Sequence, residues 1–344
     1  MRTRMISAVL ALALAIVALG GCGKQATVNI YNWGDYMDPA VLEAFEKETK
    51  IKVVYEVYST NEELLAKLKA GGTNYDVVIP STNMLEVFLA QNLLSEIDLS
   101  KIPNFKNLDP QFTNLESDPG NKYSVPYFWG TIGILYNAAA IGTDIDSWTS
   151  MHDPKYKGKI IMFDSVRDTI GVTLMMLGYD LNSTDAAELE EAKMVLIAQK
   201  ALLHSYTVDG YEDPLLAGDA LLAMAWSGDA FKVIQENSSF KYVLPKEGSN
   251  VWVDSMAVPK SAKNKEEAYK FIDFILRPEI AAQLADYLGY STPNLEGQKL
   301  LPEEIRANKV IYPDGNVFEN NAVQVDIREA TEVYDRIWTE IKSN

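Results

Sequence analysis

Apolar and polar positions alternate along the first part of the chain with two different periods. Three short runs rich in β-branched and aromatic residues predict strands, at 28–31, 51–58 and 76–80. Between these runs, apolar residues at helical spacing predict helices. The first helix has Asp38 as its N-cap and Pro39 in its first turn. The second follows Ser59, which with Glu62 resembles a capping box, and it stops at 71–72. This order predicts a parallel sheet with helices on its faces.

The rest of the chain mixes strands and helices in a less regular order. Further strands are expected at 123–127, 132–137, 159–163, 221–226 and 251–258. Further helices are expected at 83–90, 167–177, 186–203, 228–236, 265–276, 279–288 and 321–341. The 344 residues suffice for two ordinary domains. Because no Pro/Gly/Ser-rich linker separates two halves, we expect strands that cross directly between the domains, as in a hinge between two lobes.

The N-terminus has the pattern of an export signal. Two arginines precede an almost wholly apolar stretch over 5–19, which is shorter than the ~20 residues that span a bilayer. Two glycines and then Cys22 follow, an arrangement that resembles the bacterial lipobox. We therefore expect a signal peptide over 1–21, lipidation of Cys22, a tether over 22–26 and attachment to the membrane through the lipid. A plain secretory signal with an accidental cysteine is the alternative.

Charge and composition narrow the chemistry. There are 48 acidic and 31 basic residues, a net charge of −17, so a nucleic-acid partner is not expected. A negative field favours a small cation, although surface solvation explains the same charge. One cysteine and two histidines provide no internal disulfide and no Cys/His zinc set. Phosphate-loop, zinc-protease, nucleophile-elbow and dinucleotide motifs are missing, so we expect no catalytic residue, cofactor or metal, and a binding protein rather than an enzyme.

Tryptophans near carboxylates are the candidate binding residues. The three pairs are Trp33 with Asp35, Trp226 with Asp229, and Trp252 with Asp254. The first two follow predicted strands, where ligands bind in open parallel sheets. Aromatic faces attract an alkylammonium ion and cover its methylenes, and carboxylates accept hydrogen bonds from its NH₃⁺ groups. A polyamine, with several such charges on an apolar chain, needs both elements. The alternative is that each tryptophan simply belongs to the core.

Six segments carry a resemblance along nearly the whole mature chain: 31–36, 75–82, 123–133, 163–169, 252–259 and 289–295. In these segments the chain resembles the spermidine/putrescine-binding proteins of bacterial polyamine ABC importers, within the periplasmic-binding-protein superfamily. The resemblance implies an α/β fold of two lobes, each a central mostly parallel sheet flanked by helices, joined by crossing hinge strands. It implies one lobe from 27–132 and 253–303, and another from 133–252 and 304–344. It also implies a polyamine ligand, ABC permease subunits as partners, and a place in the bacterial cell envelope, at the outer face of the cytoplasmic membrane or in the periplasm.

The resemblance also implies roles for individual residues. Its aromatic surfaces are Trp33, Tyr36, Trp226 and Trp252; its acids are Asp168 and Asp254; its polar contacts are Ser81, Tyr290 and Gln324. Ser165 stands where spermidine-preferring members can carry a second acid, whereas Asp229 stands where putrescine-preferring members carry one. Asn83 replaces a tyrosine of some members and Gly34 replaces a threonine or serine. Compared with these members, the chain lacks an acid at Ser165 and has one at Asp229. The preference for a diamine or a triamine ligand therefore stays open.

Structural roles compete with these assignments. Asp168 and Asp229 could serve as helix N-terminal charges, and Ser81 as a helix cap. Asp254 could have a structural partner within its strand. Three alternative functions also stay open at this point: a binding protein for another cationic or small solute, a surface hydrolase using two acids, and an extracellular sensor or adhesion lipoprotein.

Overall fold

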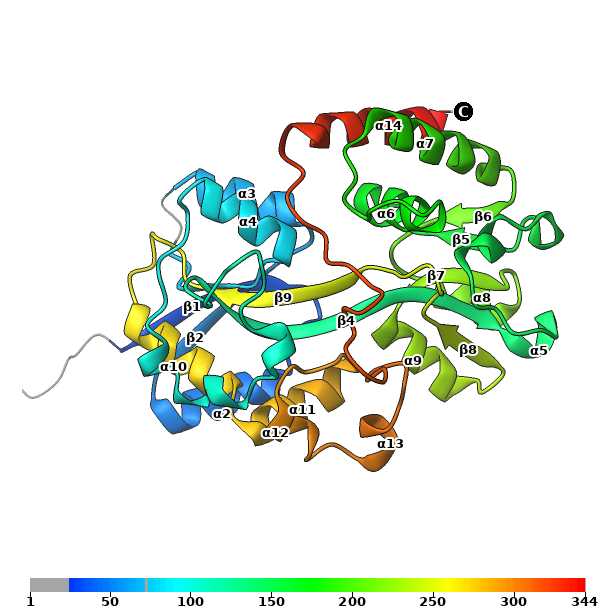
Figure 1. Cartoon of the computed structure of the whole chain (residues 1–344). Coiled ribbons are helices and arrows are strands. Elements are labelled where there is room, and N and C mark those ends of the chain that lie inside the picture. Colours follow the sequence, from blue (N-terminus) through cyan, green and yellow to red (C-terminus); the bar gives the residue numbers. More distant parts are fainter. Residues whose placement is uncertain (1–24, 72–73, 344) are drawn as a thin grey trace, which may run out of the picture.

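The computed structural model describes residues 25–71 and 74–343 (Figure 1). The expected signal peptide, Cys22 and the first part of the tether lie outside the described residues, as does Gly72. Within the described ranges, no helix combines the length and the apolar character needed to cross a membrane.

In the ranges that the structure describes, nine strands form one continuous sheet. They are β1 (Thr27–Trp33), β2 (Lys52–Tyr58), β3 (Val77–Val78), β4 (Ser124–Asn137), β5 (Ile160–Met162), β6 (Leu203–Tyr206), β7 (Leu222–Trp226), β8 (Phe240–Val243) and β9 (Val251–Ala257). Their order is β2-β1-β3-β9-β4-β7-β5-β6, and β8 pairs with β4 outside this path. At the two ends of the sheet, β1 pairs in parallel with β2 and β3, and β5 with β6 and β7. In the middle, β4 and β9 run antiparallel to each other.

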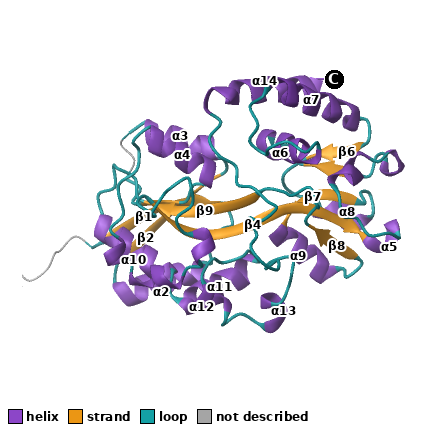
Figure 2. Ribbon diagram, in the orientation of Figure 1, coloured by secondary structure: helices purple, strands orange, loops and turns teal. Residues whose placement is uncertain are grey.

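Helices cover the sheet on both faces (Figure 2). They are α2 (Pro39–Thr49), α3 (Asn61–Lys69), α4 (Thr82–Ala90), α5 (Ala138–Ile141), α6 (Val166–Met176), α7 (Ala186–Lys200), α8 (Glu212–Ala217), α9 (Ser227–Glu236), α10 (Lys265–Ile275), α11 (Pro278–Leu288), α12 (Leu295–Gln298), α13 (Glu303–Arg306) and α14 (Thr331–Ser343). Short 3-10 turns occur at Leu99–Lys101, Pro103–Asn107, Pro110–Phe112, Trp148–His152, Pro154–Tyr156 and Arg328–Ala330. The expected α/β class is confirmed.

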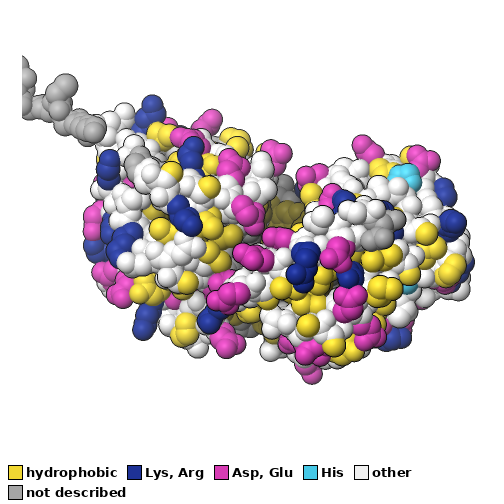
Figure 3. Space-filling model, turned by 90° about the horizontal axis from the view of Figure 1, so that it is seen from above, with side chains coloured by type: hydrophobic (Ala, Val, Ile, Leu, Met, Phe, Trp, Pro, Cys, Tyr) yellow, Lys and Arg dark blue, Asp and Glu magenta, His cyan; other side chains and the backbone are white. Residues whose placement is uncertain are grey.

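The molecule has two lobes with separate cores, and β4 and β9 run from one lobe into the other (Figure 1). One core contains Val28 and Phe271, and the other contains Ile134 and Leu222. Seen from above, the surface is hollowed between the lobes, with hydrophobic side chains deep in the hollow and acidic side chains along its rim (Figure 3). The expected boundaries, 27–132 with 253–303 and 133–252 with 304–344, stay a prediction.

Several local expectations were wrong. The strands expected at 123–127 and 132–137 are one strand, β4, because the residues between them also pair with β9, with an irregularity between Pro126 and Phe128. The C-terminal helix begins at Thr331 and not at 321, because the backbone of 322–325 is engaged elsewhere. There Ala322 bridges Asn250, and Asn182 bonds to the backbone at Val323 and Val325.

The capping box of α3 lies one residue later than expected. Thr60 Oγ1 accepts the N–H of Glu63 at 3.1 Å, and the Glu63 carboxylate accepts the N–H of Ser59 at 3.0 Å. The helix therefore starts from Thr60 and not from Ser59 with Glu62. Asp38 caps α2 as expected, accepting the N–H of Ala40. Strands β6 and β8 and helix α8 were not anticipated, because their patterns are short.

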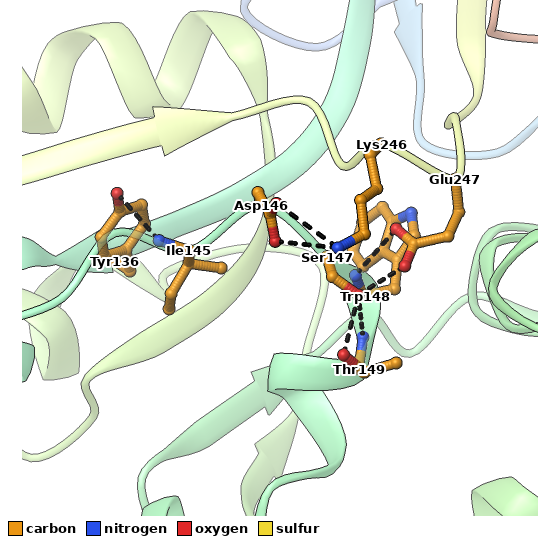
Figure 4. A network of polar contacts seen from close by, with 8 residues as sticks. All are labelled: Tyr136, Ile145, Asp146, Ser147, Trp148, Thr149, Lys246 and Glu247. Carbon is orange, nitrogen blue, oxygen red and sulfur yellow. Dashed lines mark hydrogen bonds and ion pairs between the residues drawn. The ribbon is translucent and has the colours of Figure 1, made fainter.

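A polar network ties the chain after β4 to the turn before β9 (Figure 4). Glu247 accepts hydrogen bonds from the Ser147 hydroxyl and from the backbone N–H of Trp148. The indole of Trp148, which is fully buried, donates to the carbonyl of Gly248 at 2.8 Å. Tyr136, on β4, accepts the backbone N–H of Ile145 at 3.4 Å. The contacts of Glu247 and Gly248 hold the turn from which β9 enters the middle of the sheet.

Candidate functional site

Aromatic rings from both lobes form a continuous row across the middle of the molecule. Tyr36, in the loop after β1, lies edge to face with Tyr290, with ring centroids 6.0 Å apart. Tyr290 meets Trp252 at 5.2 Å, and Trp252 meets Trp226 at 6.2 Å, both again nearly perpendicular. Trp226 in turn packs on Phe163 at 4.7 Å. Edge-to-face contacts of this kind are favourable for aromatic pairs, so the row is an ordered apolar surface.

Two glycines make room for this row. A Cβ on Gly130, in β4, would lie 2.4 Å from Cζ2 of Trp252. A Cβ on Gly228, in the first turn of α9, would lie 2.4 Å from Cε1 of Tyr290. Neither glycine has a positive φ, so it is the close approach of the ring, and not the backbone conformation, that requires glycine. A glycine occurs within strand β4 because the ring of Trp252 packs directly against its backbone.

Asp254 lies at the Tyr36 end of the row, on β9. It is 7% exposed and pairs across the sheet with Ser81, at the start of α4. Burial raises the pKa of Asp254 to about 6, and the hydroxyls of Ser81 and Tyr36 oppose that rise. The Tyr36 hydroxyl is buried and has no hydrogen bond of ordinary geometry among the described residues, although the nearby Asp254 helps to raise its pKa. The carboxylate therefore carries a charge that its own surroundings compensate poorly.

Asp229 lies in the first turn of α9, beside Tyr290 of the row. Its Oδ2 accepts the hydroxyl of Tyr211 at 3.0 Å, and its Oδ1 accepts that of Tyr290 at 3.3 Å. Burial raises the pKa of Asp229, while Tyr211, Lys232 and Tyr290 lower it. The Tyr290 contact joins Asp229 to the aromatic row.

Asp168, on α6, is held by a third group of polar side chains. Ser165, the N-cap of α6, donates to Oδ2 at 2.6 Å. Asn250 and Gln324 donate to Oδ1 at 3.1 and 2.7 Å. Burial raises the pKa of Asp168, and the bonds from Ser165, Asn250 and Gln324 oppose the rise. Ser165 and Gln324, two of the expected site residues, thus both donate hydrogen bonds to the carboxylate of Asp168.

None of these three carboxylates forms a direct ion pair with a lysine or arginine within 25–71 and 74–343. An anionic group that is shielded from water and lacks a counter-charge is costly. Arg167 lowers the pKa of Asp168 and Lys232 lowers that of Asp229 without a direct ion pair, whereas no cationic group among the described residues acts on Asp254. A bound cation would therefore offset the cost chiefly at Asp254. Trp252 Nε1, buried without a hydrogen-bond partner in the described chain, is a further polar atom left free in the row.

The remaining expected residues occupy the edge of this arrangement. Trp33 is half-buried; its indole donates to the carbonyl of Ile79 at 2.9 Å and its ring packs on Tyr58 at 4.6 Å. Asp35 is exposed, with a positive φ of 48°. Asn83 is half-buried on α4. The structure therefore brings together one group of direct neighbours: Tyr36, Tyr290, Trp252, Trp226, Asp229 and Asp254. Trp33 packs instead on Tyr58, and among the described hydrogen bonds none joins Asp35 or Asn83 to this group.

Sequence reasoning missed three residues that support the site. Tyr211 bonds to Asp229, Asn250 bonds to Asp168, and Tyr58 contacts Trp33 and helps place the Ile79 carbonyl, to which it donates at 2.5 Å. Each is distant in sequence from the group it contacts, so no local pattern marks it. Asn250 directly precedes the strand that contains Trp252, and this position was the one sequence signal that could have pointed to any of the three residues.

The chemistry of this arrangement is that of cation capture. Rings cover apolar methylenes and attract positive charge, and the carboxylates accept hydrogen bonds from ammonium groups. In the described part of the chain, no group of three or more histidine, cysteine or acidic side chains could hold a metal ion. A two-lobed α/β molecule with a hollow between its lobes, and with aromatic and acidic side chains gathered from both, has the architecture of a solute-binding protein.

Comparisons with known proteins identify the family. A model described as bacterial extracellular solute-binding protein matches residues 40–310. The chain is 39% identical over 338 residues to the spermidine/putrescine-binding periplasmic protein of Escherichia coli (strain K12), covering 96% of this chain and 97% of that protein. The chain belongs to this family of solute-binding proteins, which are extracellular or periplasmic.

Solved structures agree with this assignment. A putative spermidine/putrescine ABC transporter protein from Listeria monocytogenes is 41% identical, with a TM-score of 0.85 over 92% of this chain and 98% of that chain. A lipoprotein of Treponema pallidum is 29% identical, with a TM-score of 0.84 over 92% of this chain and 100% of that chain. The two-lobed solute-binding fold is confirmed.

Proposed function

We propose that this protein is the substrate-binding component of a bacterial ABC importer for polyamines, with putrescine or spermidine as its ligand. The observation that carries the proposal is Asp254: a buried carboxylate without a counter-cation, beside the row of rings that includes Tyr36 and Trp252. Relatives with 39–41% identity are named for spermidine and putrescine. Ligand specificity in such a site belongs to the side chains and not to the fold.

The site suits a flexible chain with positive ends. One ammonium group would bind at Asp254, with Ser81 and Tyr36 at hand as further hydrogen-bonding groups. The methylenes would lie along Trp252 and Tyr290, each aromatic contact with the cation contributing about 0.5–2 kcal/mol. The second ammonium group would reach Asp229 or Asp168. A neutral solute of the same length would gain the apolar contacts and leave the carboxylates unpaired.

Binding and lobe movement are coupled in this proposal. The site residues come from both lobes, and β4 and β9 connect the lobes without a long linker. A ligand that contacts both lobes favours a closed arrangement by the difference between its affinities for the closed and open states. The closed form would then be recognised by the permease subunits, and the ligand would be released unchanged, without catalysis.

The place of action follows from the N-terminus. The apolar stretch over 5–19 and Cys22 support a lipid anchor that holds the lobes at the outer face of the cytoplasmic membrane or in the periplasm. One similar structure is named as a lipoprotein. Labelling of the full chain with a radioactive fatty acid tests the anchor, since Cys22→Ser should abolish incorporation.

Isothermal titration calorimetry of the mature chain tests the function. Putrescine, spermidine and spermine are compared with amino acids and with butane-1,4-diol, which keeps the chain of putrescine and lacks its charges. The proposal expects binding of at least one polyamine, no binding of the diol, and strong weakening in Asp254→Asn. If the protein preferred another cation or solute, the proposed ligand would be wrong, but the assignment as a solute-binding protein would stand. Recovery of a chemically altered amine after long incubation would contradict a purely binding role.

A further inference from the structure

Tyr211, which is not among the expected site residues, forms a hydrogen bond with the carboxylate of Asp229. We propose that Tyr211 is a positioning residue for ligand binding: its hydroxyl holds the Asp229 carboxylate and the backbone at Trp226 in one fixed arrangement. This inference rests on the proposed function, because it concerns the same site. Tyr211 itself touches no ligand in this account.

The geometry places Tyr211 directly behind the wall of the site. Its side chain is fully buried, and it precedes helix α8. Its hydroxyl donates to Oδ2 of Asp229 at 3.0 Å and accepts the backbone N–H of Trp226 at 3.1 Å. The hydroxyl therefore acts both as a donor and as an acceptor, and each of its two partners is an expected ligand-binding residue. A tyrosine needed only to fill the core would not require this pair of bonds.

The ring of Tyr211 adds a second link to the same wall. It lies 5.8 Å from Phe163, and Phe163 packs on the indole of Trp226 at 4.7 Å. Trp226 is therefore held at its backbone by the hydroxyl of Tyr211 and at its ring by the neighbour of Tyr211. Packing of this kind locks the rotamers that a binding site needs.

The two carboxylate oxygens of Asp229 are held differently. Oδ2 is bonded to Tyr211, within the same core, at 3.0 Å, whereas Oδ1 has the longer contact with Tyr290, at 3.3 Å. Tyr290 is expected in the other lobe. We infer that Tyr211 fixes Oδ2 and thereby presents Oδ1 toward the hollow, where an ammonium group can compete for it.

The charges around Asp229 decide what the loss of this bond would do. The groups that face Asp229 are Tyr211 and Asp209 before α8, Glu212 on α8, Lys232 on α9 and Tyr290 after α11. Burial raises the pKa of Asp229, whereas the Tyr211 hydroxyl lowers it. Without that hydroxyl, Asp229 would keep its proton to higher pH, and only the longer contact with Tyr290 would hold its carboxylate.

Tyr211→Phe tests the inference, and Tyr136→Phe is its matched control. Tyr136 is buried in the same core, and its hydroxyl donates to the Asp144 carboxylate and accepts the backbone N–H of Ile145, each at 3.4 Å. Neither partner is an expected site residue, and the contact with Ile145 is drawn in Figure 4. Two readouts are used. The first is a ¹³C carboxyl NMR titration of Asp229 in the ligand-free protein, with the signal assigned through Asp229→Asn. The second is putrescine affinity against pH, measured by calorimetry.

In Tyr211→Phe, the Asp229 signal should titrate at higher pH, and putrescine affinity at neutral pH should fall about tenfold, the size expected for a hydrogen bond to a charged group. Tyr136→Phe should change neither. Tyr211→Phe added to Asp229→Asn should cost less affinity than Tyr211→Phe alone, because only the bond to the Trp226 backbone is then lost. An unchanged Asp229 titration, or an equal loss of affinity with and without Asp229, would overturn the inference. Failure of the wild-type protein to bind any amine would refute the proposed function, and the ligand-free titration would still decide the role of Tyr211.

Discussion

Acidification should weaken polyamine binding through one identifiable carboxyl group. Asp254 is almost fully shielded from water, and burial raises its pKa to about 6. A polyamine keeps its protons throughout the acid range, since alkylammonium groups titrate near pH ~10. Between neutral pH and pH 5 the ligand therefore stays the same, and Asp254 changes from an ion to a neutral acid that no longer attracts it.

The size of the effect follows from the pKa of about 6. At pH ~7.5 nearly all molecules have the ionised carboxylate, and at pH ~5 only about one in eleven does, for a single group with one proton. Because the ligand binds the ionised form, affinity should fall about tenfold, or about 1.4 kcal/mol, over this range. Asp168 and Asp229, whose pKa values burial also raises, add to the loss in the same direction.

Ligand-free stability should change in the opposite sense. The folded-state pKa of Asp254 lies above its unfolded value, so the folded protein binds the proton more strongly. The contribution of this group to the free energy of unfolding should therefore rise as the pH falls through about 6, by about 1.4 kcal/mol at pH ~5. The carboxylate thus favours the ligand at neutral pH at a cost to the empty protein.

Calorimetry with putrescine at several pH values, paired with urea unfolding of the empty protein, measures both effects. Asp254→Asn should bind weakly at every pH and lose most of the acid dependence of both quantities, whereas Lys263→Ala, an exposed control, should keep them. If the acid dependence persisted undiminished in Asp254→Asn, the assignment of that carboxylate would be refuted.

Three further changes probe the rest of the site. Trp252→Ala should weaken putrescine about 10- to 30-fold by calorimetry, the loss of one strong cation–ring contact, and an affinity equal to that of Lys263→Ala would count against its role. Asp229→Ser should weaken putrescine more than spermidine in the same assay, and the reverse ranking would remove Asp229 from diamine recognition. Gly228→Ala should lower the free energy of unfolding in urea, because the new Cβ meets the Tyr290 ring, and Tyr290→Ala should relieve that loss; an equal loss in both backgrounds would show that the ring is not the obstacle.

The elements of the first lobe could be predicted because their signals are local. Asp38 and Pro39 mark the start of α2, and the β-branched runs of β1 and β2 stand between clear helical patterns. Strand β4 was predicted as two consecutive strands, at 123–127 and 132–137. Only the structure shows that Gly130 makes room for Trp252, which comes from a distant strand.

The C-terminal segment shows the same limit. Residues 321–330 were assigned to a helix, although the side chain of Asn182 and the bridge to Asn250 fix the backbone within 322–325, and the 3-10 turn Arg328–Ala330 follows. Such contacts join residues far apart in the chain, and tertiary context overrides local helix propensity there.

In the candidate site, too, some residues could be predicted from the sequence and some contacts could not. Pairing of tryptophan and carboxylate along the chain pointed to Trp252 with Asp254 and Trp226 with Asp229, and these residues lie in or beside the aromatic row. The partnership of Asp168 with Gln324 and of Asp229 with Tyr211 depends on how the lobes and the crossing segment fold together. No spacing in the sequence encodes it.

A crystal structure of the mature chain with putrescine would locate the ligand itself. We expect one putrescine between the lobes, with a terminal nitrogen within hydrogen-bond distance of Asp254 and the methylenes against Trp252. Putrescine bound elsewhere, or a hollow that stays empty at saturating ligand, would contradict this expectation.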